Sequence, residues 1–385
     1  MNLQSPNLRN LLLAGFILTF TAACGSNSSD DSVNVVDDTS MDMPTDPPVA
    51  EQPFQELYNQ GVDRYLGVFA PMSANQSSDG ITTYTFDGSA DGPVCFTGNP
   101  FAMSTRDGTR SELIIFLQGG GACTPNACDA VEAAEPATPI PFGILSATDP
   151  TNPAADYNTA YLPYCDGSLW MGDRDSDEDG DGTSDRLFRG LQNLSASLDV
   201  IVGAYPSPSK ILLTGNSAGG AGTHAAIPLV RKLYPEVPIE LVNDSGMGIL
   251  PEGGQDNLNL YWNSDAFFPD SCENCIGDDG NLTDYHKYQL AEDPDLRVGF
   301  LSTKQDAVVT VERGTLSGAE FEEQLLVAIG ELSDAFPERF QSMIADGDGH
   351  TFILRDFERA VGGVTVKQWI TDMLDDDADW VSVSD

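Results

Sequence analysis

Basic residues are scarce in this 385-residue chain, which carries 18 Lys and Arg against 60 Asp and Glu and has a formal net charge of −42. Binding to nucleic acid or to an anionic membrane surface requires clustered Lys and Arg, so the composition argues against both kinds of partner. Such acidity is typical of a protein that stays hydrated in salty surroundings, or of an acidic secreted protein from any habitat. Hydrophobic residues still make up 41% of the chain, which excludes wholesale disorder.

The N-terminal region lacks an apolar run long enough to span a bilayer, because Leu11–Phe20 falls well short of the ~20 residues that a membrane helix needs. Arg9 precedes this run, and the small residues Ala22 and Ala23 follow it. A short apolar stretch in this setting predicts a secretory signal peptide over residues 1–23.

Cys24 follows the two alanines directly, and this arrangement resembles a bacterial lipobox, in which the cysteine becomes the lipid-bearing first residue. We therefore expect an exported protein, in the outer membrane or at the cell surface, that meets the membrane only through this lipid anchor. Residues 24–53 are rich in Ser, Asp, Asn and Pro and predict a flexible acidic tether. A single folded domain is expected over residues 54–385, with an acidic insertion at 173–185.

Six cysteines remain after Cys24, and an even number in an exported chain predicts three disulfides. The sequence allows 15 connectivities. Close spacing favours Cys123–Cys128 and Cys272–Cys275, which leaves Cys95–Cys165 as the long pair. A zinc site is the alternative, but the chain has only three histidines and none lies at ligand spacing from these cysteines.

Short apolar runs alternate with helical stretches along the folded part. The run Glu112–Leu117 ends at three glycines, as a buried strand would. Such alternation is typical of an α/β protein whose mostly parallel sheet is covered by helices on both faces. We expect further strands at Ala160–Pro163, Lys210–Thr214, Pro238–Val242, Arg297–Leu301 and Phe340–Ala345, and helices at Leu187–Ala204, Gly219–Leu233, Phe321–Ala335 and Val366–Leu374.

The strongest chemical signal is the GNSAG sequence at residues 215–219, which follows an expected strand and opens an Ala-rich helix. A nucleophilic serine needs this context, because a strained strand-to-helix turn lifts its hydroxyl above the sheet. Small residues are required two positions on either side, where the backbones crowd together. We therefore predict that Ser217 is a nucleophile, against the alternative of a plain glycine-rich turn.

The serine needs a histidine as base, and three are available. His224 lies on the same helix about 10 Å beyond Ser217 and is interpreted as a packing residue. His286 belongs to a polar helical segment, for which we expect a surface role. His350 follows the last expected strand and a turn at 346–349, where the base arrives in the chain order Ser, Asp, His.

The third member of a triad is a carboxylate that holds the imidazole in the correct tautomer. Asp306, just after the expected strand Arg297–Leu301, fits this role best. Asp244 and Asp348 are the competing candidates: Asp244 ends the strand that follows the nucleophile, and Asp348 is close to His350 in sequence.

Backbone N–H groups must also stabilise the oxyanion that forms on the substrate. Two sources are expected, namely Ala218, directly after the nucleophile, and the glycine-rich loop Gln118–Ala122 after an earlier strand. Glycines there allow the backbone to approach the developing charge closely.

These motifs together resemble the pectin acetylesterase family, which includes the Notum carboxylesterases. Four segments match family motifs in order between Leu113 and His350, and they are FLQGGGAC, YLPYCDGSLWMGD, RLFRG with GNSAGG, and NDSG. Two departures stand out. The family's tryptophan after the glycines is missing, with Gly121 and Ala122 in its place, and the surroundings of His350 lack the family's flanking cysteine.

The resemblance implies an α/β-hydrolase fold and a serine esterase that needs no cofactor for catalysis. The implied triad is Ser217, Asp306 and His350, and the implied oxyanion donors are Gly120, Gly121 and Ala218.

The acidic insertion begins with Asp175, Asp177 and Asp179, followed by Gly180, as in the first half of a calcium-binding loop. It is not an EF-hand, because Arg186 occupies the position of the last carboxylate. Alternating oxygens predict a structural calcium ion, against the alternative of a solvated acidic loop. The candidate ligands are Asp175, Asp177, Asp179, Asp181 and Asp185.

We expect an exported serine esterase that removes acetyl or other short acyl groups from carbohydrate-type substrates. Two alternatives remain open. One is a serine hydrolase that acts on a polyester, a lipid or a protein-linked acyl chain, and the other is a non-catalytic, calcium-dependent surface-binding lipoprotein. The oligomeric state cannot be read from the sequence.

Overall fold

The computed structural model describes residues 52–88, 91–276, 281–312 and 316–385. The predicted signal peptide, Cys24 and the tether up to residue 51 lie outside these residues.

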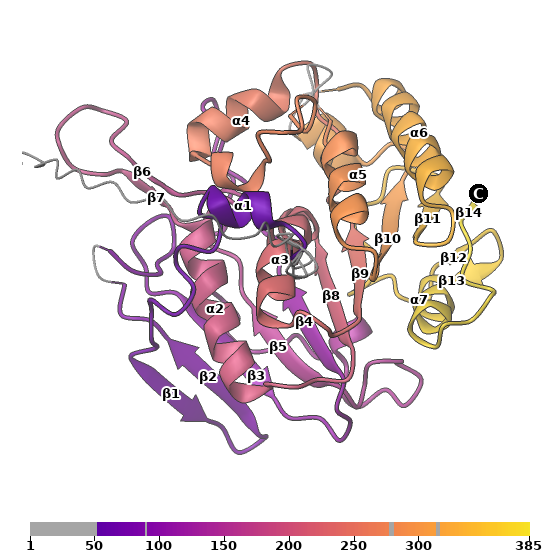
Figure 1. Cartoon of the computed structure of the whole chain (residues 1–385), viewed down its shortest axis with the longest axis horizontal. Coiled ribbons are helices and arrows are strands. Elements are labelled where there is room, and N and C mark those ends of the chain that lie inside the picture. Colours follow the sequence, from indigo (N-terminus) through magenta and orange to yellow (C-terminus); the bar gives the residue numbers. More distant parts are fainter. Residues whose placement is uncertain (1–51, 89–90, 277–280, 313–315) are drawn as a thin grey trace, which may run out of the picture. The chain divides into compact units, whose positions relative to one another are not determined.

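Ten strands of the described chain form one sheet, in the order β1-β2-β3-β5-β4-β8-β9-β10-β11-β14 (Figure 1). The strands from β5 to β14 in this order are parallel to their neighbours, whereas β1, β2 and β3 form an antiparallel extension beside β5. The mostly parallel α/β sheet expected from the sequence is confirmed and is that of an α/β-hydrolase-like fold. The strands are β1 (Ser73–Gln76), β2 (Ile81–Thr85), β3 (Ala102–Arg106), β4 (Leu113–Leu117), β5 (Asn158–Leu162), β8 (Ile211–Asn216), β9 (Ile239–Asp244), β10 (Leu296–Thr303), β11 (Phe340–Ala345) and β14 (Val383–Ser384).

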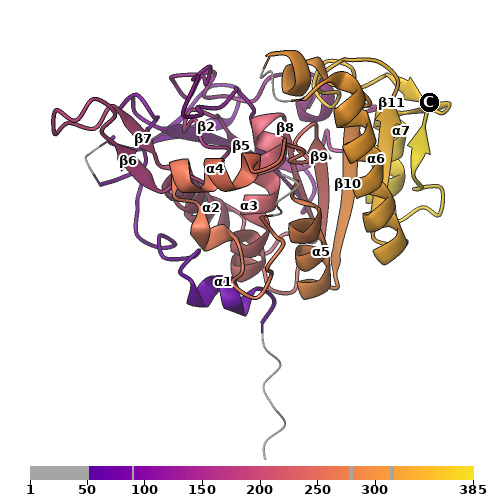
Figure 2. The same cartoon turned by 90° about the horizontal axis from the view of Figure 1, so that it is seen from above.

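Helices cover both faces of this sheet, as Figure 2 shows most clearly for α7 on the side opposite α5 and α6. The predicted helix Val366–Leu374 has the expected bounds, but Leu187–Ala204 begins three residues late, because Leu187 and Phe188 belong to a hairpin strand. The helices are α1 (Gln55–Asn59), α2 (Gly190–Ala204), α3 (Ala218–Leu233), α4 (Gly254–Trp262), α5 (Thr283–Glu292), α6 (Gly318–Ala335) and α7 (Val366–Leu374), with single turns at Gly143–Leu145, Asp265–Phe267 and Val308–Glu312.

Local sequence determines where several helices begin. Ser317 accepts the backbone N–H of Glu320 at the start of α6, and the Glu320 side chain accepts the N–H of Ser317, which completes a capping box. Thr365 caps α7 in the same way through the N–H of Gln368. These bonds satisfy donors that a helix otherwise leaves free at its first turn.

Two hydrophobic cores lie on opposite faces of the sheet, and the residues of β4 alternate between them. Leu113, Ile115 and Leu117 belong to the larger core, with the apolar faces of α2, α3 and α6. Ile114 and Phe116 belong to the smaller core, with α7. A strand buried on both faces has no polar alternation, which explains why β4 reads as a continuous apolar run.

Two short hairpins lie outside the main sheet. One pairs β6 (Arg174–Ser176) with β7 (Arg186–Phe188) and projects from the body of the fold (Figures 1 and 2). The other pairs β12 (Ala360–Val361) with β13 (Val364–Thr365). The three disulfides join the cysteines in the pairs favoured by spacing, namely Cys95–Cys165, Cys123–Cys128 and Cys272–Cys275.

The expectation of a surface role for His286 is wrong. Its side chain is buried beside His224, with ring centroids 4.0 Å apart, and Phe300 packs edge-on against both rings. His224 is the packing residue that we expected. His224 Nδ1 lies 2.9 Å from Gln289 Oε1 and His286 Nε2 lies 2.9 Å from the carbonyl oxygen of Met247, so each ring donates one hydrogen bond and remains neutral.

Burial lowers the pKa of His286 to about 4, and burial together with the neighbouring His286 lowers the pKa of His224 well below its ordinary value. An unfolded chain binds protons at these histidines near pH 6.5, whereas the folded chain does not. The stability that the pair contributes is therefore present above pH 6.5 and is lost as the pH falls towards 4.

We predict that the wild-type protein loses more unfolding free energy between pH 8 and pH 5 than a His286→Gln variant, by about 2 kcal/mol. Gln keeps a donor for the Met247 carbonyl but does not titrate. Urea unfolding at both pH values measures the difference. An equal loss in both proteins would show that His286 takes up its proton in the folded state.

Candidate active site

Ser217 occupies a sharp turn between β8 and α3, at the carboxyl end of the parallel strands. Its backbone has φ 56° and ψ −122°, a conformation that L-residues rarely adopt. The glycines two positions away permit this turn. A Cβ on Gly219 would lie 2.0 Å from the carbonyl oxygen of Leu117, and one on Gly215 would lie 2.4 Å from the carbonyl oxygen of Gly219.

The glycine-rich loop after β4 lies against this turn. A Cβ on Gly119 would lie 2.2 Å from the carbonyl oxygen of Asn216 and 2.8 Å from the Cβ of Ser217. The N–H of Gly119 donates to Asn216 Oδ1 over 3.3 Å. The residue before the nucleophile therefore holds the loop next to it, a role that the sequence analysis missed because an Asn at this position has no special pattern.

The three N–H groups expected to bind an oxyanion have no protein acceptor among the described residues. These are the N–H groups of Gly120, Gly121 and Ala218. Ala218 is the first residue of α3, so its N–H also lies at the positive end of the helix dipole.

His350 is hydrogen-bonded to Asp306. Its Nδ1 lies 2.6 Å from Asp306 Oδ2, and the other carboxylate oxygen accepts the N–H groups of Val308 and Val309 over 3.0 and 3.3 Å. Asp306 is fully buried. Because Nδ1 donates to the carboxylate, Nε2 carries the lone pair; it is buried and has no hydrogen-bond partner in the described part of the chain.

No hydrogen bond joins either competing carboxylate to His350 in the described part of the chain. Asp244 Oδ2 accepts the N–H groups of Phe352 and Ile353 over 2.7 and 2.9 Å, and its carbonyl oxygen accepts the N–H of Ser217 over 2.7 Å. Burial raises the pKa of Asp244 to about 6. Asp244 thus connects the nucleophile turn with the segment after His350. Asp348 is exposed, and its carbonyl oxygen accepts the N–H of Ala307.

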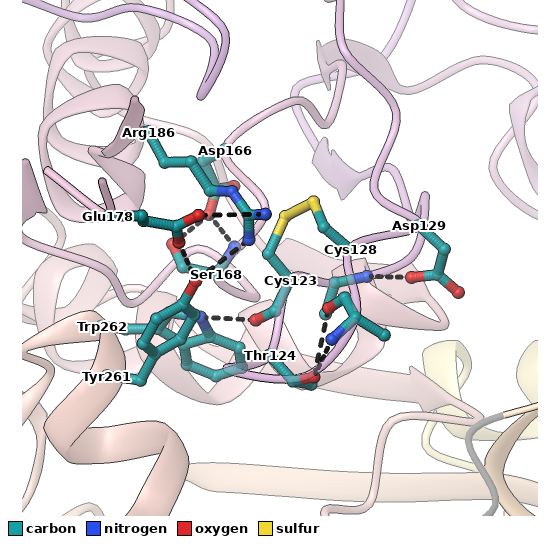
Figure 3. The surroundings of a disulfide bond; sticks show 12 residues. Cys123, Thr124, Cys128, Asp129, Asp166, Ser168, Glu178, Arg186, Tyr261 and Trp262 are labelled. Carbon is teal, nitrogen blue, oxygen red and sulfur yellow. Dashed lines mark hydrogen bonds and ion pairs between the residues drawn. A yellow bond between two sulfur atoms is a disulfide. The ribbon is translucent and has the colours of Figure 1, made fainter. Parts of the chain in front are cut away.

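A buried carboxylate that sequence reasoning missed shapes the turn after β5. Asp166 Oδ1 accepts the N–H and the hydroxyl of Ser168, the N–H over 2.8 Å (Figure 3). It also accepts the N–H of Trp170 over 3.2 Å. Burial raises the pKa of Asp166 to about 6. In this turn Leu169 and Trp170 have positive φ angles of 56° and 70°. The Trp170 side chain packs against α3, since a Cβ on Gly222 would lie 2.2 Å from the Trp170 ring.

The acidic insertion forms the tip of the β6–β7 hairpin, and the structure brings together three of its five candidate metal ligands. Carboxylate oxygens of Asp177, Asp179 and Asp185 lie within 4.8 Å of one another, and all three residues are exposed. Asp175 instead pairs with Arg189 through bonds of 2.9 and 2.6 Å, and Asp181 accepts the N–H of Thr183. Three of the five candidate ligands thus lie close together in the structure, and calcium binding by this loop stays a prediction.

The hairpin is joined to the end of α4. Glu178 contacts Arg186 over 3.3 Å and accepts the hydroxyl of Tyr261 over 2.6 Å, and Arg186 also donates to that hydroxyl over 3.0 Å (Figure 3). The next residue, Trp262, donates its indole N–H to the carbonyl oxygen of Cys123 over 2.8 Å.

Comparison with known proteins gives one family and several relatives. The pectinacetylesterase family model matches residues 74–252. Over this part the chain is similar to the pectinacetylesterases. This finding confirms the resemblance expected from the sequence, and the matched part contains the glycine-rich loop and Ser217 but ends before Asp306 and His350.

Curated relatives include two carboxylesterases of Xenopus laevis. The chain is 26% identical over 215 residues to palmitoleoyl-protein carboxylesterase notum1′, which covers 51% of this chain and 41% of that protein. It is 30% identical over 146 residues to palmitoleoyl-protein carboxylesterase notum2, which covers 35% of this chain and 29% of that protein. The chain thus spans less than half the length of these relatives.

The helices of the described chain are short or carry polar residues along their length. None of them, over residues 52–385 with the stated gaps, is both long and apolar enough to cross a bilayer.

If Asp177, Asp179 and Asp185 bind calcium, the ion should raise the melting temperature, because a ligand that binds only the folded state stabilises it. Calcium at 100 times its Kd adds about 2.7 kcal/mol, which corresponds to several degrees in a domain of this size. Thermal unfolding at low salt, with calcium and then with excess EGTA, measures the shift.

An Asp177→Asn variant should lose this shift, whereas Asp79→Asn, which changes an exposed acid in the turn between β1 and β2, should keep it. The absence of any shift in the wild type would favour the solvated acidic loop.

Proposed function

We propose that the protein is an exported serine esterase that hydrolyses short-chain carboxylic esters through Ser217, His350 and Asp306. The observation that carries this proposal is the His350–Asp306 pair, with Nδ1 on the carboxylate at 2.6 Å and a buried, unpartnered Nε2. Ser217, Asp306 and His350 follow β8, β10 and β11, and the carboxyl ends of parallel strands meet at one edge of a sheet.

The chemistry follows from these positions. Ser217 attacks the ester carbonyl while His350 Nε2 takes the hydroxyl proton, and the same proton then passes to the leaving alcohol. Water hydrolyses the resulting acyl-enzyme in a second, equivalent step. Asp306 stabilises the imidazolium that forms, and the free N–H groups near Ser217 stabilise the negative charge on the carbonyl oxygen.

A short acyl group on a neutral, carbohydrate-type alcohol is the substrate that we propose. The family's tryptophan after the glycines is absent. The half-exposed side chain of Val131 lies beside the glycine-rich loop instead, since a Cβ added to Gly120 would be 2.6 Å from the Val131 side chain. The alternative is an acyl chain linked to a protein, which is favoured by the names of the Xenopus relatives. A polyester or lipid substrate and a non-catalytic binding role are further outcomes that the experiments below distinguish.

Charge argues against a polyanionic substrate. Four arginines lie near the motifs that form the site, and three of them are paired with carboxylates. Arg110 pairs with Glu112, Arg186 with Glu178 and Arg189 with Asp175. The fourth, Arg106, is half-buried and donates to the Leu145 carbonyl and the Thr159 hydroxyl.

Export rests on the sequence of the first 24 residues. We propose a signal peptide and a lipid on Cys24. Radiolabelled palmitate incorporation that is lost in a Cys24→Ser variant would support the anchor.

We predict that Ser217→Ala abolishes hydrolysis of a soluble aryl acetate and also prevents labelling by a fluorophosphonate. Asp306→Asn should lower kcat by up to about 10⁴-fold, because the imidazole would lose its correct tautomer. Asp244→Asn should lower stability, since two backbone N–H groups depend on that carboxylate, and change kcat much less.

Wild-type activity in Ser217→Ala would contradict the proposed nucleophile, and absence of both labelling and hydrolysis in the wild type would favour the binding role. A larger loss of kcat in Asp244→Asn than in Asp306→Asn would show that Asp244, and not Asp306, is the carboxylate of the triad.

We also predict that neutral acetyl esters, such as acetylated neutral sugars, are hydrolysed faster than acetylated polygalacturonate in dilute buffer. The net charge of −42 repels a polyanion over a Debye length of about 8–10 Å at 0.1–0.15 M salt, and over a longer distance in dilute buffer. Added salt should narrow the ratio of the two kcat/KM values. A preference for the polyanion at low salt would contradict this assignment.

A further inference from the structure

The segment Cys123–Val131, which we call the brace, contacts the glycine-rich loop at three successive residues. The N–H of Val131 donates to the carbonyl oxygen of Gly120 over 2.8 Å. The N–H of Ala122 donates to Asp129 Oδ1 over 3.1 Å, a bond drawn in Figure 3. Between them, Gly121 has φ +82°, and a Cβ there would lie 2.6 Å from the carbonyl oxygen of Asp129.

These two bonds fix the direction in which the N–H of Gly121 points. In a trans peptide unit the C=O and the next N–H point in opposite directions. Because the Gly120 carbonyl points to Val131, the N–H of Gly121 points away from the brace. The bond from Ala122 to Asp129 fixes the following peptide unit, so the loop is held on both sides of Gly121.

The disulfide connects the brace to the buried body of the fold. Cys123 is fully buried, its N–H donates to the Gly167 carbonyl over 2.7 Å, and its carbonyl oxygen accepts the indole N–H of Trp262. The disulfide to Cys128 spans an exposed turn. It therefore holds Cys128, the residue directly before Asp129, at a fixed distance from the buried Cys123.

The geometry points to Asp129 and the Cys123–Cys128 disulfide as positioning elements that orient the N–H of Gly121 as an oxyanion donor. This inference rests on the proposed esterase function. An oxyanion donor acts mainly on the transition state, so a donor that is free to rotate lowers kcat and leaves KM nearly unchanged. Loss of a whole donor lowers kcat about 10²–10³-fold, and loss of its orientation should cost less.

The test compares four variants with the wild type on a soluble aryl acetate. Asp129→Ala and the double variant Cys123→Ala/Cys128→Ala should each lower kcat by about 10- to 100-fold with KM within about twofold. Asp129→Asn keeps the accepting oxygen and should restore most of kcat. The double variant Cys272→Ala/Cys275→Ala, which removes a disulfide of similar loop length elsewhere in the chain, should keep wild-type kcat.

Melting temperatures and far-UV spectra show whether each variant is folded at the assay temperature, and the Asp129 pair carries the test if the Cys123/Cys128 variant unfolds. Unchanged kcat in Asp129→Ala, or a loss that Asp129→Asn does not relieve, would overturn the positioning role of Asp129. Equal losses in the two disulfide variants would overturn the specific role of Cys123–Cys128. If wild-type hydrolysis does not depend on Ser217, the proposed function fails first and this inference falls with it.

Discussion

The close approach of three backbones at the nucleophile turn is the constraint on which the rest of the site depends. Gly215 and Gly219 bring α3, β8 and the end of β4 so near one another that a single Cβ on Gly219 would lie 2.0 Å from the Leu117 carbonyl. That proximity also places the glycine-rich loop against Ser217, with Asn216 as the hydrogen-bonded link. Any side chain larger than hydrogen at these positions would separate the nucleophile from its oxyanion donors.

Side chains that accept backbone N–H groups hold the loops of the site, and apolar packing holds the sheet beneath them. Asp244 joins the nucleophile turn to the segment after His350, Asp166 forms the turn after β5, and Asp129 fixes Ala122. Carboxylates are strong acceptors. Burial raises the pKa of Asp166 and of Asp244, because the hydrogen bonds that each carboxylate accepts do not fully offset its desolvation. A few of the chain's many acids therefore have a structural task.

Sequence patterns predicted the parts that packing and close approach dictate. The central strands are continuous apolar runs, and Ser217 lies in a glycine-spaced turn, so both could be found without a structure. Strands β1 and β2 were missed because their residues are half-buried or exposed, and β3 was missed because its buried residues include the polar Ser104 and Thr105, so none of the three forms an apolar run. His286 was misjudged because a polar helix can still bury one face, and Asn216 and Asp129 were missed because a side-chain-to-backbone bond between loops has no signature in spacing.

The acidic hairpin is closed on itself below its tip. The bidentate contact between Arg189 and Asp175 joins its base, and Asp185 accepts the N–H groups of Glu178 and Asp179 within the tip. These hydrogen bonds hold the two ends of the segment 179–184 close together. A longer segment could therefore replace it without changing the contacts of the rest of the fold. Exposed loop tips of this kind tolerate insertion, which makes this hairpin a natural attachment point for a fluorophore or an affinity handle.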